Sequence, residues 1–109
     1  MRLSQSFFAT LRENVKDEDS VSGNLLVRAG MIKKSSAGVY MYLPLGYKVL
    51  KKIENIVREE MERAGSQELL MPALIPEEVY VASGRRDNFG SSMFSLKDRF
   101  SKSYVLGPT

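Results

Sequence analysis

The sequence contains no cysteine and no histidine. Without cysteine the chain has no disulfide bonds and no thiolate chemistry, which fits a reducing compartment. Without histidine it lacks the most common general base and the most common zinc ligand. Ser-His-Asp and Cys-His catalytic sites are therefore excluded within this chain, and we expect it to carry no catalytic residue and no metal site.

Long apolar runs and glycine-rich phosphate loops are also missing. No apolar run approaches the roughly 20 residues that a membrane-spanning helix needs. The opening stretch MRLSQSFFATLRE has no long apolar segment of the kind found in signal peptides. We therefore expect no membrane partner and a cytoplasmic location. Neither G-x-G-x-x-G nor G-x-x-x-x-G-K-[ST] occurs, so no phosphate-binding loop is indicated.

Charge and size set only broad limits on the class of protein. The 16 basic and 13 acidic residues give a net charge of +3, which permits contact with nucleic acid without arguing for it. A length of 109 residues, 43% of them hydrophobic, suits one globular domain or part of one.

The clearest pattern is a long amphipathic helix over residues 47–64. Its apolar positions recur every three or four residues, at Leu50, Ile53, Val57, Met61 and Ala64. On the polar side we expect the ion pairs Glu54–Arg58 and Glu59–Arg63, which have the favourable i,i+4 order. Gly65 is placed to end the helix.

A short apolar strand over residues 68–71 should follow this helix and stop at Pro72. Proline has no backbone N–H to donate to a sheet, so a strand that ends on proline lies at an edge or an end. Such a strand is often one that meets something outside its own sheet.

The rest of the chain reads as short helices and strands in mixed order, which favours an α+β domain with an antiparallel sheet. Before the long helix we expect an edge strand or ordered arm at 6–10, a loop at 13–20, a helix from an N-cap at Ser20 or Ser22 to Gly30, and a hairpin over 31–43 that ends at Pro44 and Gly46. After it we expect a helix over 77–83, with Pro76 in its first turn and Gly84 at its end, and a loop over 85–90. Paired strands at 93–96 and 104–106 complete the domain.

Three groups of residues have the chemistry of possible sites. Glu59, Glu60 and Glu62 point in different directions on a helix, so we interpret them as a solvated face rather than a carboxylate cluster. Arg85 and Arg86 are candidate RNA contacts, because the planar guanidinium binds two phosphate oxygens; exposure or pairing within the chain is the alternative. The strand at 104–106 runs into Gly-Pro and the sequence stops at Thr109, which suggests either a frayed terminus or a chain cut in mid-domain.

Taken together, five stretches resemble the N-terminal part of the bacterial-type prolyl-tRNA synthetases, a family of class II aminoacyl-tRNA synthetases. They are the run from Leu25 to Gly65, QELLMPAL, SGR, MFSLKDR and YVLGPT. The resemblance extends from about Ser4 to Thr109, and its specificity comes from the order of the stretches.

The resemblance implies a part of a class II catalytic domain, with antiparallel strands and a long motif 1 helix. ERAGSQELLMPAL is similar to motif 1, which builds the homodimer interface in that class. By this resemblance Gly65, Leu70 and Pro72 belong to the dimer interface. In the family Gly-Pro-Thr continues into a Thr-x-Glu loop that holds the substrate proline, so the resemblance makes Thr109 a proline-binding residue.

For the parent enzyme, the resemblance implies a proline–tRNA ligase that uses ATP and Mg²⁺ and acts on proline and the proline tRNA. Motifs 2 and 3, the editing insertion and the anticodon-binding domain have no counterpart here. We therefore expect this segment to supply scaffold and dimer interface, to bind no cofactor alone and to be inactive alone.

The sequence departs from the family pattern at two places, and two other functions are compatible with it. Ala82 stands where the family usually has glutamate before Ser-Gly-Arg, and the stretch from Lys33 to Ser36 is more polar than usual. The alternatives are another class II synthetase, of the threonyl or seryl type, and a non-catalytic dimerisation module with the same fold.

Overall fold

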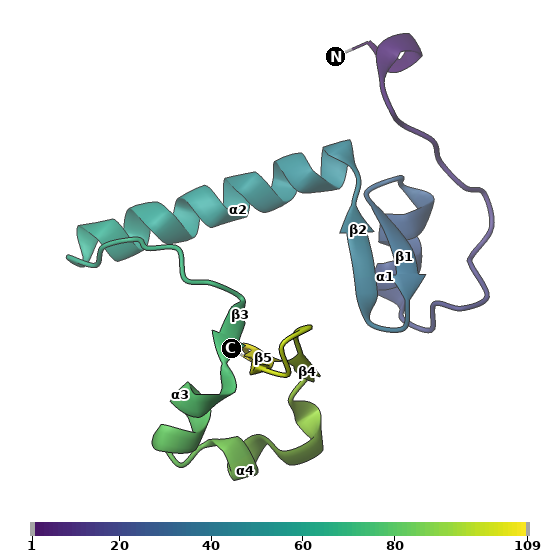
Figure 1. Ribbon diagram of the computed structural model, residues 1–109. Coiled ribbons are helices and arrows are strands. Elements are labelled where there is room, and N and C mark those ends of the chain that lie inside the picture. Colours follow the sequence, from purple (N-terminus) through teal and green to yellow (C-terminus); the bar gives the residue numbers. More distant parts are fainter. Residues whose placement is uncertain (1, 109) are drawn as a thin grey trace. The chain divides into compact units, whose positions relative to one another are not determined.

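The computed structural model describes residues 2–108 (Figure 1). The chain forms two compact units, Met1–Glu68 and Leu69–Thr109, each of which is described by itself. Both units combine helices with antiparallel strands. The predicted α+β class is therefore confirmed at that level.

The first unit is built around a two-stranded hairpin and a long helix. Its elements are η1 (Leu3–Gln5), α1 (Val21–Arg28), β1 (Ile32–Ser36), β2 (Val39–Tyr42) and α2 (Pro44–Arg63). The hairpin was predicted and is confirmed; Ile32 pairs with Tyr42, and a bulge lies between Lys34 and Ser36. The edge strand considered at residues 6–10 is absent, since this stretch is irregular.

Helix α1 begins and ends as its sequence predicts. The Ser20 side chain accepts a hydrogen bond from the Gly23 N–H at 3.0 Å, which satisfies one of the unpaired amides of the first turn. Gly30 follows the helix with φ +68°, and the Gly30 and Met31 N–H groups donate to Val27 and Leu26. This bonding pattern is a Schellman motif, which needs a left-handed residue.

Helix α2 starts at Pro44, three residues earlier than predicted. Proline suits the first helical turn because its N–H is not needed there and its φ is already helical. The expected ion pairs Glu54–Arg58 and Glu59–Arg63 are wrong. Instead, the structure pairs Lys51 with Glu54, Arg63 with Glu60 and Arg58 with Glu68, because i,i+3 partners and a residue beyond the helix compete for the same charges.

The second unit is a three-stranded sheet with two short helices. Its elements are β3 (Leu74–Pro76), α3 (Glu77–Ala82), α4 (Arg86–Phe89), η2 (Gly90–Ser92), β4 (Ser95–Lys97) and β5 (Ser103–Leu106). The strand order is β3-β5-β4, with antiparallel pairs throughout. The predicted helix α3 and the predicted pairing of the last two strands are confirmed, whereas the expected loop over 85–90 contains α4.

Burial is limited among residues 2–108. The buried apolar side chains are Ile32 in the first unit and Met93 and Val105 in the second, and Val105 has no exposed surface. Many large apolar side chains of both units stay exposed, so much apolar surface is left for contacts outside these units. Among the described residues, no helix has both the length and the apolar character required to cross a bilayer.

Candidate functional site

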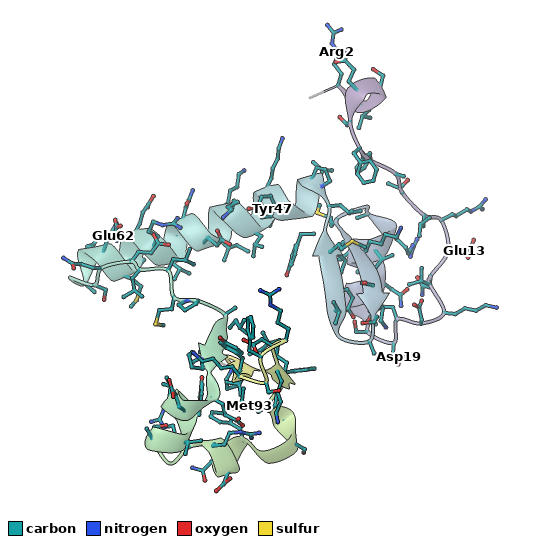
Figure 2. The ribbon with its side chains drawn as sticks, in the orientation of Figure 1. Arg2, Glu13, Asp19, Tyr47, Glu62 and Met93 are labelled. Atoms are coloured by element: carbon teal, nitrogen blue, oxygen red, sulfur yellow. The ribbon has the colours of Figure 1, made fainter. Side chains whose placement is uncertain are left out.

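The apolar side of α2 is exposed along most of its length. Side chains three or four residues apart share one side of a helix. Here the exposed ones are Val49, Ile53, Ile56, Val57 and Met61. Figure 2 shows side chains projecting all along this helix, from near Tyr47 to Glu62. The predicted amphipathic pattern is present, and its apolar side is available to a partner.

The segment after α2 exposes three further apolar side chains in a row. Gly65 ends the helix with φ +88°, and the Gly65 and Ser66 N–H groups donate to Glu62 and Met61 in a second Schellman motif. The chain then exposes Leu69, Leu70 and Met71, and Leu70 is 98% exposed. A side chain as exposed as Leu70 contributes nothing to the packing of this chain.

The predicted strand over residues 68–71 is wrong for this structure. Residues 66–72 are irregular, and the strand β3 begins only at Leu74, after Pro72. A strand requires a neighbour for its backbone N–H and C=O groups. In the part of the chain that the structure describes, no strand pairs with residues 68–71.

An ion pair ties the start of this segment back to the helix. The Arg58 Nε and Nη2 atoms donate to the two carboxylate oxygens of Glu68 at 2.6 and 3.0 Å. The hydrogen bonds from Arg58 lower the pKa of Glu68 from its ordinary value, because they stabilise the charged carboxylate. The pair therefore restrains the chain just before the exposed leucines.

Two of the predicted site segments lie side by side in the second unit. The Gly107 N–H donates to the Ala73 carbonyl oxygen at 2.9 Å, and Leu106 pairs with Leu74. The residue after Pro72 is thus bonded to the Gly-Pro stretch that precedes Thr109. Thr109 itself lies outside the described residues.

The two candidate RNA-contact arginines differ in their surroundings. The Arg86 Nε donates to Glu77 Oε1 at 2.6 Å and its Nη2 to Ser95 Oγ at 2.9 Å. The hydrogen bond from Arg86, and then its charge, lower the pKa of Glu77, because both stabilise the carboxylate. Arg86 thus has partners within the chain, whereas the Arg85 side chain is exposed.

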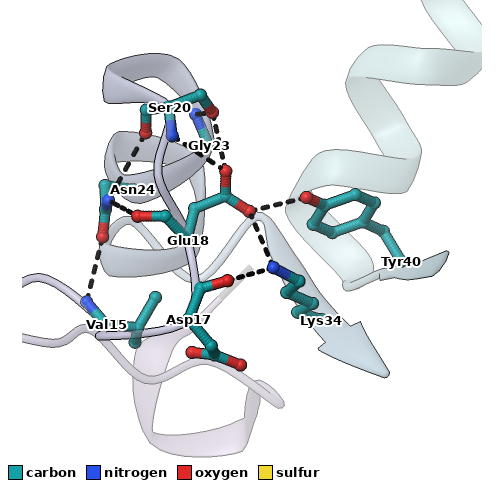
Figure 3. Close-up of polar contacts among 8 residues, drawn as sticks. All are labelled: Val15, Asp17, Glu18, Ser20, Gly23, Asn24, Lys34 and Tyr40. Atoms are coloured by element: carbon teal, nitrogen blue, oxygen red, sulfur yellow. Dashed lines mark hydrogen bonds and ion pairs between the residues drawn. The ribbon is translucent and has the colours of Figure 1, made fainter. Parts of the chain in front are cut away.

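A buried carboxylate in the first unit was not predicted from the sequence (Figure 3). Glu18 accepts hydrogen bonds from Tyr40 Oη at 2.6 Å and from Ser20 Oγ at 2.7 Å. Lys34 Nζ lies 3.9 Å from the same carboxylate and also donates to the Asp17 carbonyl oxygen. Glu18 thereby joins the loop before α1 to both strands of the hairpin.

The environment of Glu18 strongly favours its charged form. Its hydrogen bond from Tyr40, followed by those from Ser20, lowers the pKa of Glu18 from 4.5 to about 2, since each donor stabilises the carboxylate. Asn24 completes the cluster by accepting from the Val15 N–H at 2.9 Å and donating to the Glu18 carbonyl oxygen at 2.5 Å. The run ENVKDEDS reads as a solvated acidic loop, and no local signal marks Glu18 as buried.

The polar contacts described above hold segments of each unit in place. No group of three or more Asp, Glu, His or Cys side chains that is able to hold a metal ion occurs among these residues. Each unit thus has its own candidate surface: the apolar side of α2 in the first unit, and in the second unit residues 69–71 with the sheet edge that joins Ala73 to Gly107.

Comparison with known proteins gives one consistent family. No family model matches the chain. Over all 109 residues, the chain is 54% identical to a proline–tRNA ligase of Fusobacterium nucleatum, 52% to one of Finegoldia magna and 55% to one of Thermosipho melanesiensis.

The chain spans about a fifth of the length of these relatives, since the match covers 19% of each. The identity exceeds 50% and the alignment includes all 109 residues, so no part of the chain lies outside the similarity. Over its full length the chain is therefore similar to a segment that makes up about a fifth of a proline–tRNA ligase.

Proposed function

We propose that this chain is a structural part of an enzyme that activates proline with ATP and charges the proline tRNA. The observation that carries the proposal is identity of 51–55% to eight proline–tRNA ligases over the full chain. In such a reaction the proline carboxylate attacks the α-phosphorus of ATP, which gives prolyl-adenylate and releases pyrophosphate. The prolyl group then passes to the tRNA 3′ end. A cytoplasmic location suits this function.

We propose that the segment is part of a class II catalytic domain and contributes its dimer interface. The exposed apolar side of α2 supports this role, as do the exposed side chains of Leu69, Leu70 and Met71. In this proposal Gly65 directs the chain out of the helix, and Leu70 and Pro72 lie at the contact between two subunits. Residues 68–71 then gain, from a second copy, the neighbour that they lack here.

The contribution of this segment to substrate binding is proposed to be small. Thr109 is proposed to contact the substrate proline through its hydroxyl. Arg85 is exposed and is the better of the two arginine candidates for the tRNA, because Arg86 is already bonded to Glu77. ATP with Mg²⁺ is proposed for the whole enzyme, but residues 2–108 offer no metal ligand set, so we assign no metal to this segment.

Two alternatives make different predictions. A threonyl- or seryl-type synthetase would activate threonine or serine, although all three relatives named above are proline–tRNA ligases. A non-catalytic dimerisation module would bind a second copy and activate no amino acid.

The deciding experiment is amino-acid-dependent ATP–pyrophosphate exchange by the complete protein that carries this segment. We expect exchange with proline and only background with threonine or serine. Residues 1–109 alone should give background with all three. Exchange with threonine or serine in place of proline would favour the first alternative, and dimerisation without any exchange would favour the module.

A further inference from the structure

The turn between β4 and β5, in the second unit (Figure 1), is rigidly organised. One carboxylate oxygen of Asp98 accepts hydrogen bonds from the N–H groups of Phe100 and Lys102 at 2.8 and 2.9 Å. The Asp98 N–H donates to the Lys102 carbonyl oxygen at 3.0 Å. Ser101 takes φ +62°, a left-handed conformation that is unfavourable for a residue with a Cβ atom.

This turn presents aromatic rings and cations together. Phe100 is 75% exposed, and the Arg99 guanidinium carbon lies 4.6 Å from the centre of its ring. In a second pair, Lys102 Nζ lies 5.6 Å from the centre of the Tyr104 ring. Each distance lies within the range of a cation–π interaction, so each ring is matched with a positive charge.

The charge of the turn is positive and accessible. The stretch from Lys97 to Tyr104 has three cations, at Lys97, Arg99 and Lys102, and Asp98 is its one acidic residue. One of the Asp98 carboxylate oxygens is occupied by backbone donors, and the three cations are exposed. A negatively charged partner is therefore favoured at this turn.

We propose that the β4–β5 turn, residues 97–104, contacts an unpaired stretch of the tRNA, with Phe100 and Arg99 stacking on a base and Lys97 and Lys102 next to phosphates. Unpaired RNA is recognised by aromatic rings and guanidinium planes that stack on splayed bases, together with cations that neutralise the backbone. This inference rests on the proposed function, because it takes tRNA as the RNA.

A second protein is the less favoured partner for this surface. Protein contacts concentrate apolar side chains and deplete lysine, whereas this turn offers one apolar ring among three cations. The apolar surface suited to a protein partner lies elsewhere, on α2 and residues 69–71. The arrangement at residues 97–104 matches the chemistry of RNA, which carries negative charge and flat base surfaces in alternation.

The test uses the complete enzyme and two assays. Phe100→Ala and Arg99→Ala should raise the KM for tRNA in the charging reaction about 5- to 150-fold, the range expected for losing one stacked base. Proline-dependent ATP–pyrophosphate exchange, which needs no tRNA, should stay unchanged. Phe100→Trp should retain tRNA affinity, and Phe100→Leu should not, because leucine keeps the apolar volume but has no flat π surface.

Matched controls come from the first unit. Phe7 is 77% exposed and the Arg12 side chain 96% exposed, so Phe7→Ala and Arg12→Ala remove the same groups from another surface and should leave the KM for tRNA unchanged. The proposal is overturned if the Phe100 and Arg99 variants charge tRNA normally, if they reduce exchange equally, or if they weaken dimerisation instead. Absence of proline-dependent exchange in the unsubstituted enzyme would overturn the proposed function itself.

Discussion

The Gly107 N–H donates to the Ala73 carbonyl oxygen at 2.9 Å. This bond joins the residue after Pro72 to the stretch that leads to Thr109. Pro72 is proposed to contact another subunit, and Thr109 is proposed to contact the substrate proline. If both proposals hold, this backbone bond is a short route by which subunit contact would influence the substrate site. Substitutions at Pro72 and at Thr109 test the two ends of this route.

Replacing Pro72 with glycine should weaken the dimer of the complete enzyme. Glycine adds freedom to the unbound chain, which commonly costs several tenths to about 1 kcal/mol, and that freedom must be lost on association. We expect a higher dissociation constant by sedimentation equilibrium, by about two- to fivefold. Ala82→Gly, in the last turn of α3, is the control for glycine itself. An unchanged dissociation constant, with an unchanged rate of adenylate formation, would remove Pro72 from the interface.

Glu18 should make the first unit sensitive to acid. Its pKa is lowered from 4.5 to about 2 in the folded chain, so the charged form stabilises the fold fully above pH 4.5. That contribution is lost as the pH falls from 4.5 towards 2. We expect the hydrogen-exchange protection of α1 and the β1–β2 hairpin to fall over this range in the complete protein.

Two variants separate Glu18 from the other acids. Tyr40→Phe removes the hydrogen bond that lowers the Glu18 pKa most, so the acid-induced loss of protection should be smaller and should end at a higher pH. Glu13→Gln is the control, because the Glu13 side chain is 89% exposed. If Tyr40→Phe changes neither the size of the loss nor the pH at which it ends, the Tyr40–Glu18 bond does not govern the acid response.

Gly46→Ala should destabilise the first unit, although alanine is normally the better helix residue by about 1 kcal/mol. A Cβ atom at position 46 would collide with the Met31 carbonyl oxygen. That oxygen is held in place by the Leu43 N–H at 2.9 Å, so it has little freedom to move away. We expect a loss of about 1–3 kcal/mol, measured from hydrogen exchange of the hairpin amides. The control is Glu59→Ala, at an exposed position of the same helix, which should have little effect. If Gly46→Ala is neutral or stabilising, the Met31 carbonyl oxygen is able to move away from the added Cβ atom.

The features predicted most accurately are those that depend on residues close together in the sequence. The period of α2, the Ser20 cap of α1 and the hairpin over residues 31–43 each arise from residues that are close in the sequence. The ion pair Arg58–Glu68 was missed because its acid lies outside the helix. The burial of Glu18 was missed because its strongest partner, Tyr40, is 22 residues away.

The predicted strand at 68–71 failed for a different physical reason. Leu69, Leu70 and Met71 have the apolar character of a strand, but a strand exists only where its backbone groups find a partner. The sequence pattern reflects the tendency of a segment to form a strand. The structure of a single chain contains only the partners that lie within that chain. The dimer proposal predicts that this stretch becomes regular when two subunits associate.

Thr109→Ala should affect proline and spare ATP. Proline offers a ring, a carboxylate and one charged nitrogen, and a hydroxyl is able to accept a hydrogen bond from that nitrogen. Losing a hydrogen bond to a charged group typically costs about 1.5–3 kcal/mol, or about 10- to 150-fold in an equilibrium constant. In the complete enzyme the KM for proline should rise, or kcat/KM should fall, by that order, while the KM for ATP stays close to its original value.

Thr109→Ser keeps the hydroxyl and should keep most of the activity. Unchanged proline kinetics in Thr109→Ala, or equal damage to proline and ATP binding, would mean that Thr109 supports the fold and does not touch the substrate.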